Sequence, residues 1–235
     1  MATTTRRTTD QRMRRRPTKQ GTVLSEALII DTALRLVREH GEGGLTVRRL
    51  GAALGADPSA LYRYFRSTDE LLLAIGDELI GRCMAGHRPS GDWLADLRDI
   101  GRRIHTTYRD HPRVAQLLAF RVTARTHEIA AVETLLGVLR GAGFGDADAV
   151  RYYHAFVDQA LAFAALDTAM LGLPEGVRDA RAWSETYAAL PAAERPHIAA
   201  TAGHLVAEMR ESGYALALEL LLESLASRLR GPAPR

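Results

Sequence analysis

Apolar side chains recur every three or four residues along most of this chain, which is the spacing of one face of an α-helix. Within residues 25–40, for example, Ile29, Ala33, Leu36 and Val37 keep this spacing. The segments between such stretches are rich in glycine, proline and polar residues, which favour turns. The pattern predicts an all-α protein.

Four helices are predicted in the first third of the chain. They cover residues 25–40, 47–54, 59–65 and, after Ser67, about 68–83. Gly55 stands where the chain leaves the second helix, and glycine readily adopts the left-handed backbone that ends many helices. Asp57 and Pro58 open the third helix, since proline is tolerated in a first helical turn. Two short helices joined by such a turn, between longer helices, form a helix-turn-helix.

Polar residues at the expected helix ends support these bounds. Thr46, Asp92 and Asp146 each stand at the start of a predicted helix, where a side-chain oxygen can accept a hydrogen bond from a free backbone amide. Ser67 and Glu70 have the spacing of a capping box, in which the hydroxyl caps the helix and the carboxylate reaches back.

The third helix is the one that lies in the major groove of DNA in a helix-turn-helix. Leu61 and Phe65 are four residues apart, so we expect both to face the core. The side chains left for the outer face or its edges are those of Ser59, Tyr62, Arg63 and Tyr64. A tyrosine placed there can pack on sugar and donate to phosphate. Alternatively, Tyr62 and Tyr64 are half-buried packing residues.

The segment LTVRRLGAALGADPSALYRYFRSTDELLLAIGDEL, residues 45–79, closely resembles the DNA-binding domain of the tetracycline-repressor (TetR) family. The matching elements are Leu45-Thr46-Val47, Leu50, Leu54-Gly55, Ala60-Leu61-Tyr62, Tyr64-Phe65 and Leu71-Leu72. Residues 25–40 fit the first helix of the same pattern. The resemblance implies a homodimeric, all-helical transcription regulator, usually a repressor that a small ligand releases from DNA.

The resemblance also implies which side chains meet the DNA. They are Thr46, Arg48, Arg49, Ser59, Ala60, Tyr62, Arg63, Tyr64 and Arg66. Thr46 and Tyr64 would touch phosphate. Arg48, Ser59 and Tyr62 would lie nearest the bases, and the Arg48 guanidinium can bond a guanine at both O6 and N7.

The remaining arginines of this segment are expected at the edges of the contact. Arg49 would serve the DNA backbone and Arg63 would flank the bases. The family commonly has a lysine at the start of the next helix, which grips phosphate, but this chain has Thr68 there. Arg66 could supply the missing charge, or it could be a solvated side chain.

We divide the chain into a disordered basic arm at 1–21, a helix-turn-helix domain at 22–70 and a C-terminal ligand-binding and dimerisation domain at 71–235. The helices expected in the last domain cover residues 92–109, 112–122, 126–141, 146–170, 197–212 and 214–230. Residues 171–196 contain three prolines and few periodic apolar residues, so they are predicted to form a loop.

The last helix is apolar nearly all round, so it needs two partners, its own core and another surface. The helix at 146–170 carries a run of small residues that permits a close approach. The family packs two such helices per subunit into a four-helix dimer interface. The expected interface residues are Leu161, Ala164, Leu218, Leu221, Leu222, Leu225 and Leu229. The alternative is a last helix that is fully buried in a monomer.

A ligand pocket is expected between the helices at 92–170. The candidate lining residues are His105, Phe120, Tyr153, His154, Phe156 and Asp158. His154 and Asp158 are four residues apart, so they could instead form a plain pair on one helix. The tetracycline repressors bind a magnesium–tetracycline complex with the help of a histidine in this region, but residues 114–121 contain no histidine. We therefore expect a different ligand, with no metal and no cofactor.

Charge is unevenly placed along the chain. Residues 1–75 carry 13 Arg or Lys and 8 Asp or Glu, a net +5, whereas the rest carries 18 and 20, a net −2. A basic N-terminal part suggests an anionic partner at that end. The arm at 1–21 can follow a phosphate backbone or enter a minor groove, or it is a solvated tail.

Other features narrow the class of protein. Cys83 is the only cysteine, which excludes an internal disulfide and a cysteine-based zinc site. No run of about 18 apolar residues is present to span a membrane, and a cytoplasmic location is expected.

Three functions are compatible with these residues. The first is a dimeric repressor that a small molecule releases from a palindromic operator. The second is a similar regulator that senses no ligand and acts by occupancy or through a protein partner. The third, a remote alternative, is an enzyme with a DNA-binding domain. Its nearest approach to a catalytic cluster is His105, Asp110 and His111. The spacing of these residues matches no helical ligand motif.

Overall fold

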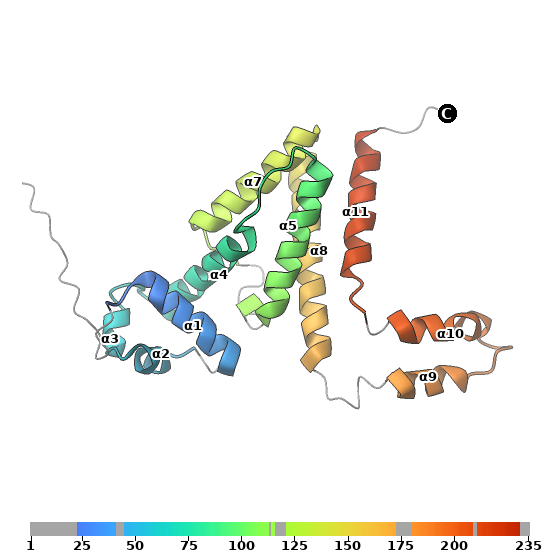
Figure 1. Ribbon diagram of the computed structural model, residues 1–235, viewed down its shortest axis with the longest axis horizontal. Helices are drawn as coiled ribbons and strands as arrows, with labels where there is room; N and C mark the ends of the chain where they lie inside the picture. The colour runs from blue at the N-terminus through green and yellow to red at the C-terminus, as the bar shows by residue number, and fades with distance from the viewer. Residues whose placement is uncertain are drawn as a thin grey trace, which may run out of the picture. The chain divides into compact units, whose positions relative to one another are not determined.

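The computed structural model describes residues 23–40, 45–112, 114–115, 121–172, 180–208 and 211–230. Every element assigned within these ranges is an α-helix (Figure 1). The chain divides into two compact units, residues 1–71 and 72–235. The predictions for the basic arm, for residues 113 and 116–120 of the helix expected at 112–122, and for Phe120 fall outside the described residues.

Unit 1 is built from α1 (Glu26–His40), α2 (Val47–Leu54), α3 (Pro58–Leu61) and the start of α4 (Thr68–Met84). The stripe predicted on α1 is buried, and α1 packs on α2, which packs on α3. The other core side chains of this unit include Leu50, Leu54, Leu61 and Phe65. The predicted inward positions of Leu61 and Phe65 are therefore confirmed.

Local chemistry sets the ends of α2 and α3 as the sequence predicts. The Thr46 hydroxyl accepts a hydrogen bond of 3.2 Å from the Arg49 amide. The Asp57 carboxylate accepts one of 2.8 Å from the Ser59 amide. These side chains satisfy amides that have no partner within the helix.

The predicted helix at 59–65 is wrong in its bounds, because α3 ends at Leu61. The amides of Tyr64 and Phe65 both donate to the Leu61 carbonyl oxygen, at 2.9 and 3.1 Å. The chain therefore continues as a tight turn after a single helical turn, and this turn still directs Phe65 into the core.

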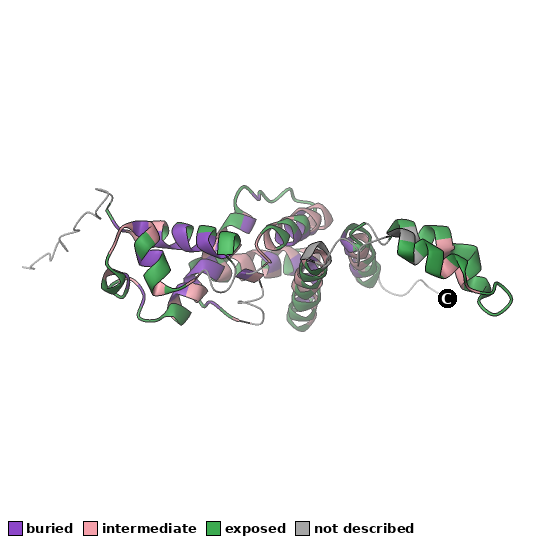
Figure 2. Cartoon of the chain, turned by 90° about the horizontal axis from the view of Figure 1, so that it is seen from below, coloured by how far each residue is buried: buried purple, intermediate pink, exposed green. Residues whose placement is uncertain are grey.

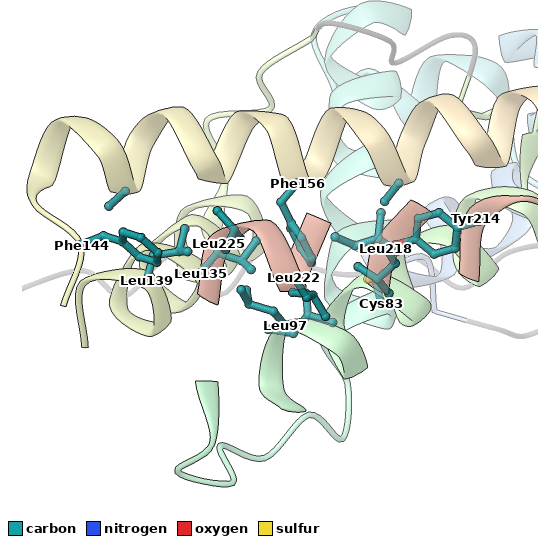
Figure 3. Packing of buried hydrophobic residues seen from close by; sticks show 14 residues of the cluster. Cys83, Leu97, Leu135, Leu139, Phe144, Phe156, Tyr214, Leu218, Leu222 and Leu225 are labelled. Carbon is teal, nitrogen blue, oxygen red and sulfur yellow. The ribbon is translucent and has the colours of Figure 1, made fainter. Parts of the chain in front are cut away.

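Unit 2 contains the rest of α4 together with the later helices. They are α5 (Trp93–Asp110), α7 (Thr126–Ala142), α8 (Asp146–Gly172), α9 (Ala180–Ala188), α10 (Pro196–Glu208) and α11 (Tyr214–Leu229). The helices α5, α7, α8 and α11 pack around one apolar core (Figure 3). Its labelled members are Cys83, Leu97, Leu135, Leu139, Phe144, Phe156, Tyr214, Leu218, Leu222 and Leu225.

One helix start and one loop differ from the predictions. Asp92 caps α5 as expected, accepting from the Leu94 amide at 2.9 Å. Asp146, however, is the first residue of α8 and not its cap. The predicted loop at 171–196 contains α9. Its three prolines lie on either side of α9 and therefore do not interrupt it.

Candidate nucleic-acid interface

Two glycines, Gly51 and Gly55, allow the tight turn between α2 and α3. Gly55 adopts a left-handed backbone, with a φ of 60°. A Cβ added at Gly51 would lie 3.0 Å from the Ala56 carbonyl oxygen and 3.3 Å from Pro58. A larger residue at Gly51 would therefore push the turn away from α2 and change the angle at which α3 is presented.

Most of the side chains predicted to meet DNA are exposed in unit 1. The exposed ones are Thr46, Arg48, Arg49, Ser59, Tyr62, Arg63 and Arg66, while Ala60 and Tyr64 are half-buried. The Tyr62 side chain is 54% exposed, although a tyrosine in a folded protein usually covers apolar surface. Arginine, hydroxyl and aromatic groups are the ones that contact phosphates and base edges.

Tyr64 has a different role from the one predicted. Its hydroxyl donates a hydrogen bond of 2.6 Å to the carbonyl oxygen of Leu24, forty residues earlier in the chain. A tyrosine hydroxyl carries a single proton, so Tyr64 cannot donate to a phosphate oxygen while this bond is intact. Tyr64 thus ties the segment before α1 to the turn after α3, in line with the alternative of a half-buried packing residue.

We expect Tyr64→Phe to lower the free energy of unfolding of the protein by about 1 kcal/mol, because only one hydrogen bond is lost while the ring stays in place. DNA affinity should change little, and the slope of affinity against salt should not change. Denaturant unfolding and a salt titration of DNA binding would measure both. A marked loss of DNA affinity at unchanged stability would restore Tyr64 as a phosphate contact.

The start of α4 has a capping arrangement shifted by one residue from the prediction. The Ser67 hydroxyl accepts from the Glu70 amide at 3.1 Å, as expected. The Glu70 carboxylate, however, accepts from the amide of Arg66, at 2.6 Å. This bond fixes the backbone at Arg66, next to the exposed Thr68 that replaces the lysine common in the family.

In unit 2, the carboxylate of Asp77 on α4 caps the start of α7. It accepts hydrogen bonds from the amides of Glu128, at 2.9 Å, and His127, at 3.3 Å. The Nδ1 atom of His127 lies 3.1 Å from the same carboxylate. Arg125, at the N-cap position of α7, makes no capping bond with its side chain. A residue about fifty positions earlier therefore replaces the local cap and fastens α4 to α7.

Among the ligand candidates, His105 lies at a buried polar cluster. Its Nε2 atom is 2.8 Å from the carboxylate of Asp167 on α8, and its ring stacks on Tyr214 of α11 at 4.2 Å between centroids. The hydroxyl of Tyr214 and the Oε1 atom of Gln159 are buried without a hydrogen-bond partner among the described residues. Unsatisfied buried polar atoms are rare, and the Tyr214 hydroxyl lies closely against Gly101 of α5.

The other ligand candidates do not converge on this cluster. Phe156 is fully buried in the apolar core, and Tyr153 is half-buried. His154 and Asp158 are exposed on α8. The expectation that these two side chains line an internal pocket is therefore wrong, because they face away from the core that buries Phe156.

Burial changes the ionisation of several groups in this core. Desolvation raises the pKa of the Cys83 thiol to about 11 and that of the Tyr108 phenol to about 12. It also raises the pKa of Tyr214. These groups are therefore neutral at physiological pH, and the core around them disfavours negative charge.

The raised pKa of Cys83 predicts a loss of stability at alkaline pH. An unfolded thiol ionises near its ordinary pKa of 9.0 and the folded one near 11, so its contribution is complete below about pH 9 and is lost as the pH rises to about 11. Unfolding free energies measured between pH 8 and 11 should fall less steeply for Cys83→Ala than for the original chain. Equal slopes would mean that the thiol does not titrate in this way.

The predicted dimer surface is partly wrong. Ala164, Leu218, Leu222 and Leu225 are only 1% exposed within the single subunit, so they belong to its own core. Leu161, Leu221 and Leu229 are partly buried against the same core. The four core residues are therefore not accessible to a second subunit, whereas Leu161, Leu221 and Leu229 remain predicted interface residues. The exposed large apolar residues of these helices are Val150 and Leu166 on α8 and Leu216 and Leu220 on α11.

Within the residues that the structure describes, no group of three or more His, Cys, Asp or Glu side chains is placed to hold a metal ion. The two histidines named above for a catalytic cluster each have another partner. His105 bonds Asp167, and the Nδ1 atom of His111 lies 3.0 Å from the carbonyl oxygen of Thr107. No described helix is long and apolar enough to cross a membrane.

Two short helices joined by a glycine-containing turn carry exposed arginines, and a larger helical unit follows them. This arrangement is that of the helix-turn-helix DNA-binding proteins with a helical C-terminal domain. Residues 29–75 match the family model "Bacterial regulatory proteins, tetR family", and residues 85–229 match "Tetracyclin repressor-like, C-terminal domain". The chain belongs to the TetR family of bacterial regulatory proteins, and the resemblance seen in its sequence is confirmed.

Known proteins agree with this fold. ActR from Streptomyces coelicolor, solved without ligand, aligns with a TM-score of 0.77 at 22% identity over 89% of this chain and 98% of its own; it has also been solved with actinorhodin. A possible TetR family regulator from Streptomyces coelicolor A3(2) aligns with a TM-score of 0.68 at 28% identity over 88% of this chain and 98% of its own. These likenesses confirm the predicted all-α fold with a helix-turn-helix domain and a C-terminal helical domain.

Curated relatives cover less of the chain. The HTH-type transcriptional repressor Rv1353c from Mycobacterium tuberculosis is 29% identical over 133 residues, which are 54% of this chain and 51% of that protein. The chain thus spans about half the length of the curated relatives it matches.

Proposed function

We propose that the protein is a sequence-specific DNA-binding transcription regulator that works as a homodimeric repressor. The observation that carries this proposal is the set of exposed arginine, serine and tyrosine side chains on α2, on α3 and in the turn after it, in a unit whose core and caps are complete. These exposed side chains are not part of that core, so packing does not account for them. They are the groups that read DNA.

Two copies are needed for this role. The helix α3 has only four residues, so one copy reaches few base edges. A dimer reads two half-sites about one helical turn apart, and the two-fold axis of the protein then matches a palindromic operator. We assign Arg48 to a guanine, Ser59 and Tyr62 to neighbouring base edges, and Thr46 to phosphate.

The basic arm adds a contact outside the helix-turn-helix. Residues 1–20 carry seven Arg or Lys and one Asp, at position 10, and each phosphate contact releases counterions. Deleting these residues is expected to flatten the dependence of DNA affinity on salt. A titration from about 50 to 200 mM salt measures the slope. If the slope is unchanged, the arm is a passive tail.

A small molecule is proposed to release the repressor by binding unit 2. Support comes from the buried Tyr214 hydroxyl, which has no hydrogen-bond partner among the described residues and whose ring stacks on His105, and from ActR, which has the same fold and has been solved with actinorhodin. A ligand that binds one arrangement of the dimer better than another shifts the population of the DNA-bound form.

A ligand panel tests this part of the proposal. Some member should raise the melting temperature of the protein and lower its operator affinity, and Tyr214→Phe should weaken the response without changing DNA binding in the absence of ligand. If no compound changes either quantity, the alternative is a regulator that acts by occupancy or through a protein partner. We propose no catalytic activity, because the family is one of regulators.

A further inference from the structure

The net positive charge of residues 1–75 comes from the segment before the first helix. Residues 22–75 carry six Arg and seven Asp or Glu, a net −1, whereas residues 1–21 carry seven Arg or Lys and one Asp, a net +6. The charged side chains described within residues 23–71 are exposed, apart from the half-buried Glu70, on helices whose inner faces are buried (Figure 2). Cations provide most of the non-specific attraction between a protein and DNA, so the basic arm is the main source of this attraction.

The start of α4 offers little attraction for phosphate. Thr68 stands where the family commonly has a phosphate-binding lysine, and the first turn of α4 contains Asp69 and Glu70. Carboxylates at this place repel a phosphate group. The Glu70 carboxylate also accepts the hydrogen bond of the Arg66 amide, at 2.6 Å, so this amide is not available to DNA. A cationic contact elsewhere is therefore expected to replace the one lost with the lysine.

The residues that connect the arm to α1 are fixed beside the turn that follows α3 (Figure 1). The Leu24 side chain is buried, and its carbonyl oxygen accepts the hydrogen bond of 2.6 Å from the Tyr64 hydroxyl. Tyr62, an exposed side chain assigned to the bases, belongs to the same turn as Tyr64. The arm therefore begins next to the part of unit 1 that is proposed to read the major groove.

From this anchor the arginines of the arm can reach the next groove of the DNA. Arg16 is seven residues before Val23, the first described residue, and seven extended residues span up to about 23–25 Å. The neighbouring minor groove lies about half a helical turn, roughly 17 Å, along the DNA axis. A narrow minor groove of A·T pairs has an enhanced negative potential that attracts arginine, and it lacks the amino group that guanine places there.

We propose that Arg14, Arg15 and Arg16 enter the minor groove that flanks each half-site and thereby select A·T pairs there. The inference rests on the proposed DNA-binding function and adds a second sequence preference to that of the major groove. Arginine suits this groove better than lysine, because a guanidinium is more weakly hydrated than an ammonium group. An arm that only followed the phosphates would have no preference between flanking sequences.

Binding titrations with the full-length protein test this preference. The probes contain the footprinted operator with unchanged half-sites and with flanks of either A·T or G·C pairs. The original chain should bind the A·T-flanked probe at least about fivefold more tightly. Replacing all three arginines by lysine keeps the charge, so the slope of affinity against salt should stay the same, while the preference should fall below about twofold.

The matched control is the double variant Arg6→Lys, Arg7→Lys, which makes the same change in the same arm but farther from the anchor. This variant should keep the preference of the original chain. Equal affinities of the original chain for the two probes would overturn the inference. A preference that survives in the triple lysine variant would overturn it as well.

Methylation of the bound DNA by dimethyl sulfate gives a second readout, because the reagent modifies N3 of adenine in the minor groove and N7 of guanine in the major groove. At saturating protein, the original chain should protect flanking adenines, and a chain without residues 1–20 should not, while both protect guanines of the half-sites. Half-site protection by the original chain without protection of flanking adenines would overturn the inference and leave the regulator intact. A chain that protects no defined sequence would contradict the proposed function and the inference together.

Discussion

Replacing Leu222 by alanine is expected to destabilise the protein by about 3–5 kcal/mol, because the side chain is fully buried and its removal leaves a cavity. Leu220, two residues earlier on α11, is 56% exposed in the single subunit, against 1% for Leu222. Leu220→Ala should therefore cost under about 1 kcal/mol in the unfolding of the monomer. Its effect should instead be a weaker dimer.

The two variants are a matched pair, since the same substitution is made on one helix. Denaturant unfolding at a protein concentration below the dimer dissociation constant measures the first effect, and sedimentation measures the second. Equal losses of monomer stability would mean that α11 buries both sides within the subunit. That result would contradict the separation of α11 into a core face and an interface.

Arg48→Ala is expected to weaken binding to the operator by about 1–3 kcal/mol, roughly 5- to 150-fold. The loss should be largest for operators that keep the preferred base at one position, so that the variant tolerates substitutions there. The reason is that a bidentate bond from a guanidinium to O6 and N7 distinguishes guanine from the other bases. Binding titrations over a set of operators with single base changes measure both quantities.

Arg38→Ala is a suitable control for this experiment. Arg38 is an exposed arginine of the same unit, at the end of α1 and outside α2 and α3. The control removes the same charge and should change affinity for all operators equally and weakly. If Arg48→Ala weakens all operators equally but strongly, Arg48 contacts phosphate and base reading moves to Ser59, Tyr62 or Arg63. If its effect is as weak as that of the control, Arg48 makes no direct contact.

The sequence was most informative where short-range chemistry determines the structure. Thr46 and Asp57 cap helices that start within two residues of them, and Gly55 needs a left-handed backbone at one defined turn. Each of these features depends on a few neighbouring residues, so the pattern alone predicts it. The buried positions of Leu61 and Phe65 follow from the same local spacing.

Features that depend on distant contacts could not be predicted in this way. The bond from Tyr64 to Leu24 and the capping of α7 by Asp77 each join segments about forty or fifty residues apart. The orientation of α11 was ambiguous because leucines occur on every side of it. Periodicity cannot choose a core face in such a helix, and only the packing of α5 and α8 against it makes Leu218 internal and Leu216 external.

The central claim, a dimeric regulator that reads a palindrome, is tested most directly by selection of DNA. The purified full-length protein is mixed with fragments of its source genome at near-physiological salt, and the bound fragments are footprinted. We predict a two-fold symmetric protected site upstream of a gene, with half-sites about one helical turn apart and with protection lost in Arg48→Ala. Binding that is sensitive to salt but protects no defined sequence would contradict the account.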